Sequence, residues 1–223
     1  MINITDRANC CGCTACASAC PHDAITMKQD CMGFSYPVVS LDLCTNCGIC
    51  DKVCAFHPQY DTSENLPNPI PYGARHKDID EISTSRSGAV FVALADWMLA
   101  QGGIIYGAGY KGHFQVAHKR ATTREEYLEF KGSKYVQSDM GDIFRNVRED
   151  LLSGKKVLFT GTPCQTAGLH SYIGKKLRNN LYLADIICHG VPGPNIWRDY
   201  ITLLEKRHGS PIVAVNFRDK SRL

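Results

Sequence analysis

The sequence contains no long, uninterrupted run of apolar residues. Its most apolar stretch, from Gly88 to Ile105, is broken by Asp96, by Gln101 and by a pair of glycines. A helix that crosses a membrane needs about 20 consecutive apolar residues. The sequence therefore predicts no membrane span.

Neither positive nor negative charge predominates in the sequence. The 223 residues include 25 Lys and Arg and 22 Asp and Glu, and no basic block stands out. Nucleic acid binding usually needs such a block, so we expect no nucleic acid partner. The first nine residues are polar and lack the apolar segment of an export signal, which favours a cytoplasmic location.

Cysteine is rare after residue 54, where only Cys164 and Cys188 occur, and abundant before it. Eight of the early cysteines write the spacing C-x2-C-x2-C-x3-C twice, as Cys10, Cys13, Cys16 and Cys20 and then Cys44, Cys47, Cys50 and Cys54. Bacterial ferredoxins with two 4Fe-4S clusters have this spacing, and the fourth cysteine of each run binds the other run's cluster. The sequence thus predicts one cluster on Cys10, Cys13, Cys16 and Cys54, and a second on Cys44, Cys47, Cys50 and Cys20.

Two other uses of cysteine fit this pattern less well. A disulfide framework needs an oxidising compartment, whereas no export signal is found. Structural zinc normally takes two well-separated C-x2-C pairs, not three cysteines at successive gaps. Cys11 and Cys31 lie outside the spacing, and we expect them to be spacers or small buried residues because eight ligand positions are already filled.

The chain divides into three parts by composition. Residues 1–56 are predicted to form an α+β ferredoxin-like module with two clusters, and residues 57–73, with four prolines among polar residues, an extended linker. Residues 74–223 alternate strand and helix patterns, which predicts an α/β domain with a mostly parallel sheet. The pattern stops just after an expected strand, so we expect this domain to be truncated at its C-terminus.

Periodicity gives the expected elements of the last part. A helix should begin at the cap Ser87 and end at Gly102, and a capping box of Thr122 and Glu125 should begin a short helix. The other expected helices are 142–152, 165–173 and 195–206, and the expected strands are 103–110, 114–120, 156–160, 181–188 and 211–217.

Ligands of open parallel sheets bind beyond the carboxyl ends of the strands. Two such ends, Gly161–Gln165 and Cys188–Pro192, each place a cysteine at the sheet edge. Cys164 also begins a helix, where the helix dipole favours a thiolate. Cys164 and Cys188 are either cofactor contacts or small buried residues, and His189 is either a proton donor or a hydrogen-bonded turn residue.

Three other polar runs are candidate cofactor sites. Gly107–Gly112 matches the dinucleotide fingerprint G-x-G-x-x-G, but a strand pattern and not a helix follows it, which favours a hairpin turn. Ser85, Ser87 and Gly88 lead into a helix N-terminus that suits a pyrophosphate, although capping alone explains Ser87. The loop Lys131–Ser138 offers a lysine for an anionic reduced flavin, and an ordinary solvated loop has the same composition.

Six blocks occur in a characteristic order: the duplicated cysteine motif, Ser85–Ala89, Gly132–Ser138, Gly161–Gln165, Cys188–Pro192 and Val215–Asp219. Their order resembles the coenzyme F420 hydrogenase/dehydrogenase beta-subunit family, and also 7-hydroxymethyl chlorophyll a reductase, a ferredoxin-fed member. The resemblance implies FAD beside the clusters, bound against these loops. Contacts with FAD are then expected from Ser85, Ser87, Gly88, Lys134, Tyr135, Gln137, Gly161, Thr162, Pro163, Cys164 and Gln165, and Cys188 and His189 become the candidate catalytic residues.

These features predict an FAD-dependent iron-sulfur oxidoreductase that works with a redox partner. With a deazaflavin or nicotinamide partner, hydride passes to or from the flavin and electrons cross the clusters singly. With ferredoxin, the clusters load the flavin, which reduces an organic substrate with a proton supplied through His189. The alternative is a non-enzymatic electron-transfer subunit, whose clusters relay charge while the rest of the chain docks another subunit.

Overall fold

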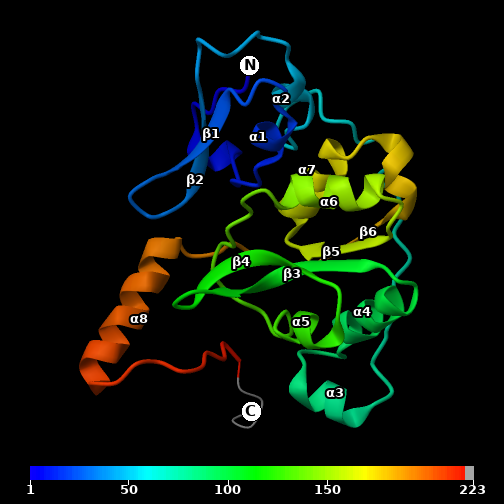
Figure 1. Cartoon of the computed structure of the whole chain (residues 1–223), viewed down its shortest axis with the longest axis vertical. Coiled ribbons are helices and arrows are strands. Elements are labelled where there is room, and N and C mark those ends of the chain that lie inside the picture. The colour runs from blue at the N-terminus through cyan, green and yellow to red at the C-terminus, as the bar shows by residue number, and fades with distance from the viewer. Residues whose placement is uncertain (219–223) are drawn as a thin grey trace.

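A four-stranded sheet lies at the centre of the chain, in a computed structural model that describes residues 1–218 (Figure 1). Its strands are β3 (Ile104–Lys111), β4 (Gln115–Ala121), β5 (Val157–Gly161) and β6 (Leu181–Asp185), in the order β4-β3-β5-β6. β5 pairs in parallel with both β3 and β6, whereas β3 and β4 form an antiparallel hairpin. The predicted mostly parallel sheet is confirmed.

The strands carry apolar side chains on both faces because helices cover both faces. On β3, Ile104 and Tyr106 point to one side and Ile105 to the other, as the two-residue period of a strand requires. The first face packs against α6 (Ile143–Leu152) and α7 (Pro163–Tyr172), and the second against α4 (Val90–Ala100) and α5 (Arg124–Leu128) (Figure 1).

The cysteine-rich module sits on the α6 and α7 side of the sheet (Figure 1). It consists of a 3-10 turn (Arg7–Asn9), two short helices α1 (Ala15–Ala19) and α2 (Ile49–Lys52), and an antiparallel hairpin of β1 (Ile25–Gln29) and β2 (Ser35–Val39). Ala15 and Val53 of this module are buried in the same core as Phe144 and Phe159 of the sheet layers. The module therefore packs directly on the α/β part.

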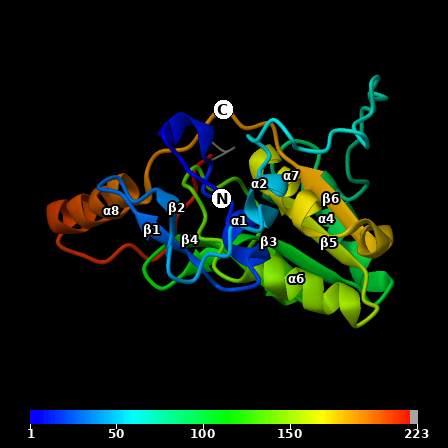
Figure 2. The same cartoon turned by 90° about the horizontal axis from the view of Figure 1, so that it is seen from above.

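The last helix, α8 (Pro194–His208), lies to one side of the sheet and touches two hairpin tips (Figure 2). Asn195 Nδ2 donates to the carbonyl of Cys31 in the β1–β2 turn at 3.0 Å, and Trp197 Nε1 donates to the Phe114 carbonyl of the β3–β4 turn at 2.9 Å. The remaining elements are α3 (Ile79–Thr84) and a 3-10 helix (Lys175–Asn180).

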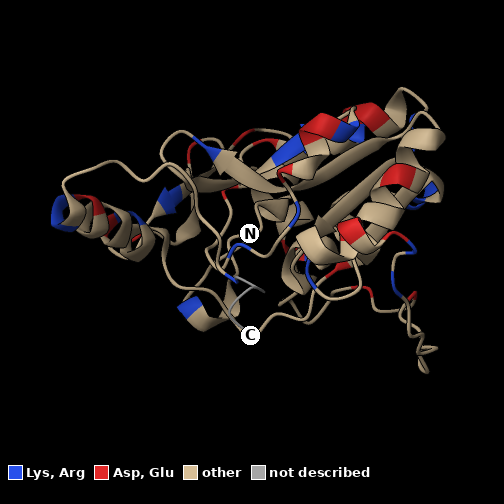
Figure 3. Cartoon of the chain, turned by 90° about the horizontal axis from the view of Figure 1, so that it is seen from below, with Lys and Arg blue, Asp and Glu red and all other residues tan. Residues whose placement is uncertain are grey.

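Basic and acidic residues are interspersed along the ribbon in the view of Figure 3. No helix within residues 1–218 combines the length and the apolar character that a membrane span requires.

The predicted helix starts differ from the structure by one to three residues. Helix α6 begins one residue later than predicted, α7 two residues earlier and α8 one residue earlier. Helix α4 begins at Val90 and not at Ser87, because Ser87 and Ala89 both adopt positive φ and form a turn that Ala89 closes as the N-cap. The capping box of α5 is formed by Thr123 and Glu126, one residue later than predicted. Its reciprocal bonds are Glu126 N to Thr123 Oγ1 at 3.3 Å and Thr123 N to Glu126 Oε2 at 3.2 Å.

Strand predictions fail where a neighbouring strand is missing. β6 ends at Asp185 and not at residue 188, because its partner β5 ends at Gly161, which pairs with Asp185. Residues 211–217 form no strand; the Ile212 amide instead donates to Glu205 Oε1 of α8 at 2.8 Å. Asp219, the end of the last sequence block, lies outside the described residues.

The rejected dinucleotide fingerprint is indeed part of a hairpin. β3 continues through Gly107 and Gly109 to Lys111, the chain turns at Gly112, and β4 returns beside it. No helix begins there, so this run has no helix N-terminus for a phosphate.

Candidate functional site

One pocket gathers the four cysteines predicted for the first cluster. Cys10, Cys13, Cys16 and Cys54 line a space of about 380 Å³ between the first motif run and the end of the second. Burial and the nearby Cys10 thiol raise the pKa of Cys16 to about 12. Four such thiols ionise together only when cations compensate their charge, as bound iron does.

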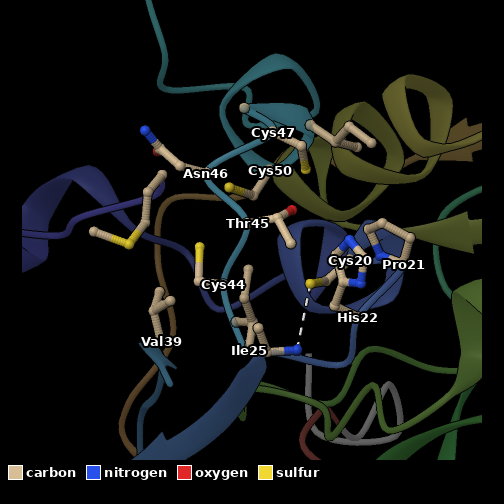
Figure 4. A pocket seen from close by; sticks show the side chains of 14 residues that line it. Cys20, Pro21, His22, Ile25, Val39, Cys44, Thr45, Asn46, Cys47 and Cys50 are labelled. Carbon is tan, nitrogen blue, oxygen red and sulfur yellow. Dashed lines mark hydrogen bonds between the residues drawn. The ribbon is translucent and has the colours of Figure 1, made fainter. Parts of the chain in front are cut away.

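A second pocket gathers the four cysteines predicted for the second cluster. Cys20, Cys44, Cys47 and Cys50 line a space of about 350 Å³ (Figure 4). Backbone amides approach two of the sulfurs: Ile2 N donates to Cys50 Sγ at 3.2 Å and Ala24 N donates to Cys20 Sγ at 3.3 Å. Such bonds to cluster sulfurs stabilise the thiolate and tune the reduction potential.

In both pockets the fourth cysteine of one run joins three cysteines of the other run, which is the crossed arrangement expected from the spacing. Within residues 1–218, no three His, Cys, Asp or Glu side chains converge on a single ion position. The thiols surround a pocket instead, and in a cubane cluster each thiolate binds its own iron. The residues fit two 4Fe-4S clusters, and the ligand assignment stays a prediction.

The two cysteines outside the spacing lie in different surroundings. Cys31 is exposed at the β1–β2 turn and lines neither pocket, so of the two expected roles it fits a spacer and not a small buried residue. Cys11 lines the first pocket, and its thiol lies beside the thiol of Cys164 on α7. The first cluster loop therefore meets the carboxyl edge of β5.

This contact acts on Cys164 in the opposite direction to the helix dipole. The contact with Cys11, together with burial, raises the pKa of Cys164 far above its usual value, although the residue lies in the first turn of α7. The Thr162 hydroxyl lies 3.2 Å from its sulfur. Cys164 is thus a neutral thiol at neutral pH, since the buried thiol contact outweighs the helix dipole.

The loops at the edge of β5 are joined by hydrogen bonds. Gln165 Nε2 donates to Ser138 Oγ at 2.9 Å, and Gln137 Nε2 donates to the Cys11 carbonyl at 3.0 Å. The Thr162 amide donates to Gln165 Oε1 at 3.0 Å, which fixes the start of α7 after Pro163. Three sequence blocks that are far apart in the chain therefore meet at one place.

The C-terminal segment connects two further blocks. Arg86, in the turn before α4, is hydrogen bonded to Asn216. The Tyr135 ring packs edge to face on Phe217, with centroids 5.6 Å apart. Ser85–Ala89, Gly132–Ser138 and Val215–Arg218 are therefore neighbours in space.

Lys134 points back into its own loop. Its ammonium donates to the carbonyls of Glu129 at 2.8 Å and Gly132 at 3.3 Å and lies 5.4 Å from the centre of the Tyr110 ring. Burial lowers the pKa of Lys134 to about 8. The structure thus gives Lys134 a role in shaping the loop, and its contact with a cofactor stays a prediction.

Two buried hydroxyls lack a partner within the described residues, Thr14 Oγ1 and Ser85 Oγ. Buried polar atoms are nearly always hydrogen bonded, so each orphan calls for an explanation. Thr14 lines the first cysteine pocket, and Ser85 belongs to the run predicted to hold a pyrophosphate. An unused donor at Ser85, beside Ser87 and Gly88 at the start of α4, fits an anionic phosphate.

The candidate catalytic residues lie apart from this network. Cys188 and His189 follow β6 in a loop where His189 is exposed, and within residues 1–218 their side chains make one hydrogen bond, from Gly190 N to Cys188 Sγ at 3.4 Å. The Ile186 amide donates to the Gly161 carbonyl at 3.0 Å, which ties the start of this loop to the β5 edge. Their catalytic role stays a prediction.

Sequence reasoning missed His118, which is buried on β4 and contacts Ser138 and Thr160. A signal was present: His118 is in phase with the buried Val116, so it is a polar residue at an inward-facing strand position. Such a residue is normally retained for its hydrogen bonds.

Two family models match the sequence. Residues 4–26 match the 4Fe-4S binding domain, and residues 154–223 match the model for the C-terminal part of the beta subunit of coenzyme F420 hydrogenase/dehydrogenase. No protein of curated function matches the chain.

A solved structure with partial similarity is the xenon derivative of the F420-reducing [NiFe] hydrogenase complex from Methanosarcina barkeri. The aligned chain is 23% identical, with a TM-score of 0.43, and the alignment covers 51% of this chain and 42% of that chain. The aligned region thus spans less than half the length of the matched chain.

Proposed function

We propose that this chain, whose residues 154–223 match the C-terminal part of the coenzyme F420 hydrogenase/dehydrogenase beta subunit, is an FAD-containing iron-sulfur oxidoreductase. Two 4Fe-4S clusters on residues 1–56 exchange single electrons with a flavin on residues 74–223. The linker 57–73 joins these two parts of the chain. The observation that carries the proposal is the crossed gathering of eight cysteines into two pockets, one of which adjoins the β5 edge.

The packing of the module supports an order for the two clusters. The first is nearer the sheet: a side chain added at Gly168 of α7 would meet Cys13 Sγ at 2.8 Å, and Cys11 contacts Cys164. The second set includes the exposed Cys47. We therefore propose that electrons enter or leave the protein at the second cluster and reach the flavin through the first (Figure 1).

The flavin is proposed to lie against the loops that meet at the β5 edge. Ser85, Ser87 and Gly88 would hold the pyrophosphate at the start of α4, and Thr162, Cys164 and Gln137 would face the cluster side. FAD supplies the conversion between two-electron and one-electron transfer when it is bound. The remaining candidate contacts are Lys134, Tyr135, Gly161, Pro163 and Gln165.

His189 is proposed to exchange protons with water, because its ring is exposed on the loop that follows β6. Cys188, beside it, would form part of the wall of the substrate site. The proposed redox partner is a deazaflavin coenzyme, ferredoxin or another subunit of a larger complex.

The first experiment asks whether the protein contains flavin. Protein purified without oxygen is extracted with acid, and the extract is examined for the absorption and fluorescence of FAD. We expect about one FAD per chain. An extract without flavin would leave the electron-transfer subunit without flavin chemistry as the better description.

The second experiment identifies the donor. Coenzyme F420, NAD(P)H or reduced ferredoxin is mixed with the oxidised protein under nitrogen, and the flavin absorption is followed. The physiological donor bleaches the flavin at catalytic rates. A protein whose flavin none of the three reduces would contradict the proposed electron route.

A further inference from the structure

The buried histidine on β4 is fixed by two hydrogen bonds and a ring contact. The His118 side chain is 5% exposed and stacks on Phe159 with ring centroids 5.1 Å apart. Its Nε2 lies 3.0 Å from the Thr160 carbonyl oxygen, and its Nδ1 lies 2.8 Å from Ser138 Oγ. Neither the two cysteine pockets nor the proposed electron route uses this residue.

The partners determine where the ring proton is. A carbonyl oxygen only accepts hydrogen bonds, so Nε2 carries the proton and donates to Thr160. Burial lowers the pKa of His118 to about 4, so the ring is neutral at physiological pH and Nδ1 has no proton. Nδ1 must therefore accept a hydrogen bond from the Ser138 hydroxyl.

The direction of the first bond fixes the direction of the following ones. Because the Ser138 proton points to His118, its oxygen lone pairs are free to accept, and Gln165 Nε2 donates to them at 2.9 Å. The amide of Gln165 is thereby oriented with Oε1 toward the Thr162 amide, which donates to it at 3.0 Å. A one-way chain of hydrogen bonds links the loop that begins α7 to β4, with each bond donated toward His118.

The chain ends at the candidate cofactor loop and not within the apolar core. An apolar residue at position 118 would fill the same space beside Phe159 without the cost of burying an imidazole. All three polar groups of the chain, on His118, Ser138 and Gln165, are satisfied, which is what makes a buried polar network stabilising and specific.

We propose that His118 is a positioning residue for the cofactor loop: its neutral Nε2–H form orients Ser138 and Gln165, and through them holds Thr162 and Cys164 in place. The inference rests on the proposed function only for the identity of the cofactor, FAD. The geometry of the loop itself belongs to the chain and can be measured without flavin.

Two substitutions separate the two hydrogen bonds of the ring. In His118→Asn the side-chain oxygen takes the place of Nδ1 and accepts from Ser138. In His118→Gln the side-chain nitrogen takes the place of Nε2 and donates to Thr160, but the Ser138 hydroxyl keeps only the distant Met140 Sδ, at 3.9 Å, as an acceptor. The loop should therefore stay in place in His118→Asn and loosen in His118→Gln, and Ser138→Ala should behave like His118→Gln.

The first measurement is the rate at which iodoacetamide alkylates Cys164 in the iron-loaded protein under nitrogen, read by mass spectrometry. We expect about a tenfold faster reaction in His118→Gln and Ser138→Ala and a rate near that of the wild type in His118→Asn. Equal rates in all four proteins, or rates that simply follow the loss of global stability, would overturn the proposal.

The second measurement is the dissociation constant for FAD, obtained by titrating deflavinated protein. The same order is expected, with binding about tenfold weaker in His118→Gln and unchanged in His118→Asn. Unchanged FAD affinity in His118→Gln would contradict the positioning role. If the wild type bound no FAD, the proposed function would fail, and the alkylation rates would still decide whether His118 positions the loop.

Discussion

The cysteine-rich module and the sheet layers are two differently stabilised parts of one molecule. Within the described residues, the core of the module is a small cluster of Ile2, Ile25 and Cys50, with Ile4, Ala17, Val39 and three further cysteines packed around it. The sheet layers bury a continuous apolar set on each face, centred on residues such as Phe144 and Phe159. From this comparison we expect the module to depend on bound clusters for its order, whereas the sheet depends on the burial of apolar surface.

Loss of a cluster ligand should break the module most strongly. In Cys13→Ser we expect the iron content to fall from about eight to about four atoms per chain, because one of two 4Fe-4S clusters loses a thiolate. Iron analysis and the visible absorption of the clusters measure this change. Cys31→Ser is the matched control, since Cys31 is exposed and outside both pockets, and its iron content should be unchanged. An iron content still near eight in Cys13→Ser would contradict the ligand assignment.

Loss of core volume should break the sheet layers instead. Phe144 is fully buried between Phe159 and Tyr172, so Phe144→Ala should lower the free energy of unfolding by about 3–5 kcal/mol. Denaturant unfolding followed by circular dichroism measures it. Leu152→Ala, on the same helix but with an exposed side chain, should change it by less than about 0.5 kcal/mol. Equal losses in the two variants would refute this account of the core.

The buried histidine makes the sheet sensitive to acid in a narrow window. The folded protein disfavours protonated His118, mainly through burial and also because of the nearby Lys134 charge, so its pKa falls from 6.5 to about 4. The unfolded chain binds the proton more readily, so the stabilisation present above pH 6.5 is lost as the pH falls toward 4. The loss amounts to about 3 kcal/mol.

This loss is read as the difference in unfolding free energy between wild type and His118→Gln across that window, because acid effects on the clusters are common to both. The wild type should lose its advantage as the pH falls. Parallel pH curves for the two proteins would show that His118 does not carry the effect.

The smallest expected effect is at the boundary between the two parts. Gly168 lies where a side chain would meet Cys13 Sγ at 2.8 Å, so Gly168→Ala should cost about 1–3 kcal/mol and shift the absorption of the first cluster. A methyl group at Gly174, two residues beyond α7, meets nothing within 4 Å. Gly174→Ala should therefore be neutral or slightly stabilising. Identical unfolding curves for the two variants would argue against close packing of the module on α7.

The sequence predicted those features that depend on neighbours in the chain. The spacing between Cys10 and Cys16 is local, and the strands near Ile104 and Val157 follow from short apolar runs, which are typical of strands covered on both faces. The end of β6 depends on where β5 ends, and the fate of residues 211–217 depends on whether an adjacent strand exists. Neither condition is written in the segment itself.

The candidate site shows the same division. The sequence blocks were recognisable, but nothing local predicted that Arg86 would meet Asn216 or that Cys11 would contact Cys164. The raised pKa of the Cys164 thiol depends on that second contact, which the helix start alone could not reveal. His118 was overlooked because its partners Ser138 and Thr160 become neighbours only when the sheet forms.

Ala15 and Val53 belong to the cysteine-rich module, but they are buried in the core on the α6 and α7 side of the sheet. If the module failed to fold without iron, the apolar surface that it covers on α6 and α7 would be uncovered. Chaperones and proteases recognise such surface. The supply of iron to the cell would then determine how much of this protein escapes degradation.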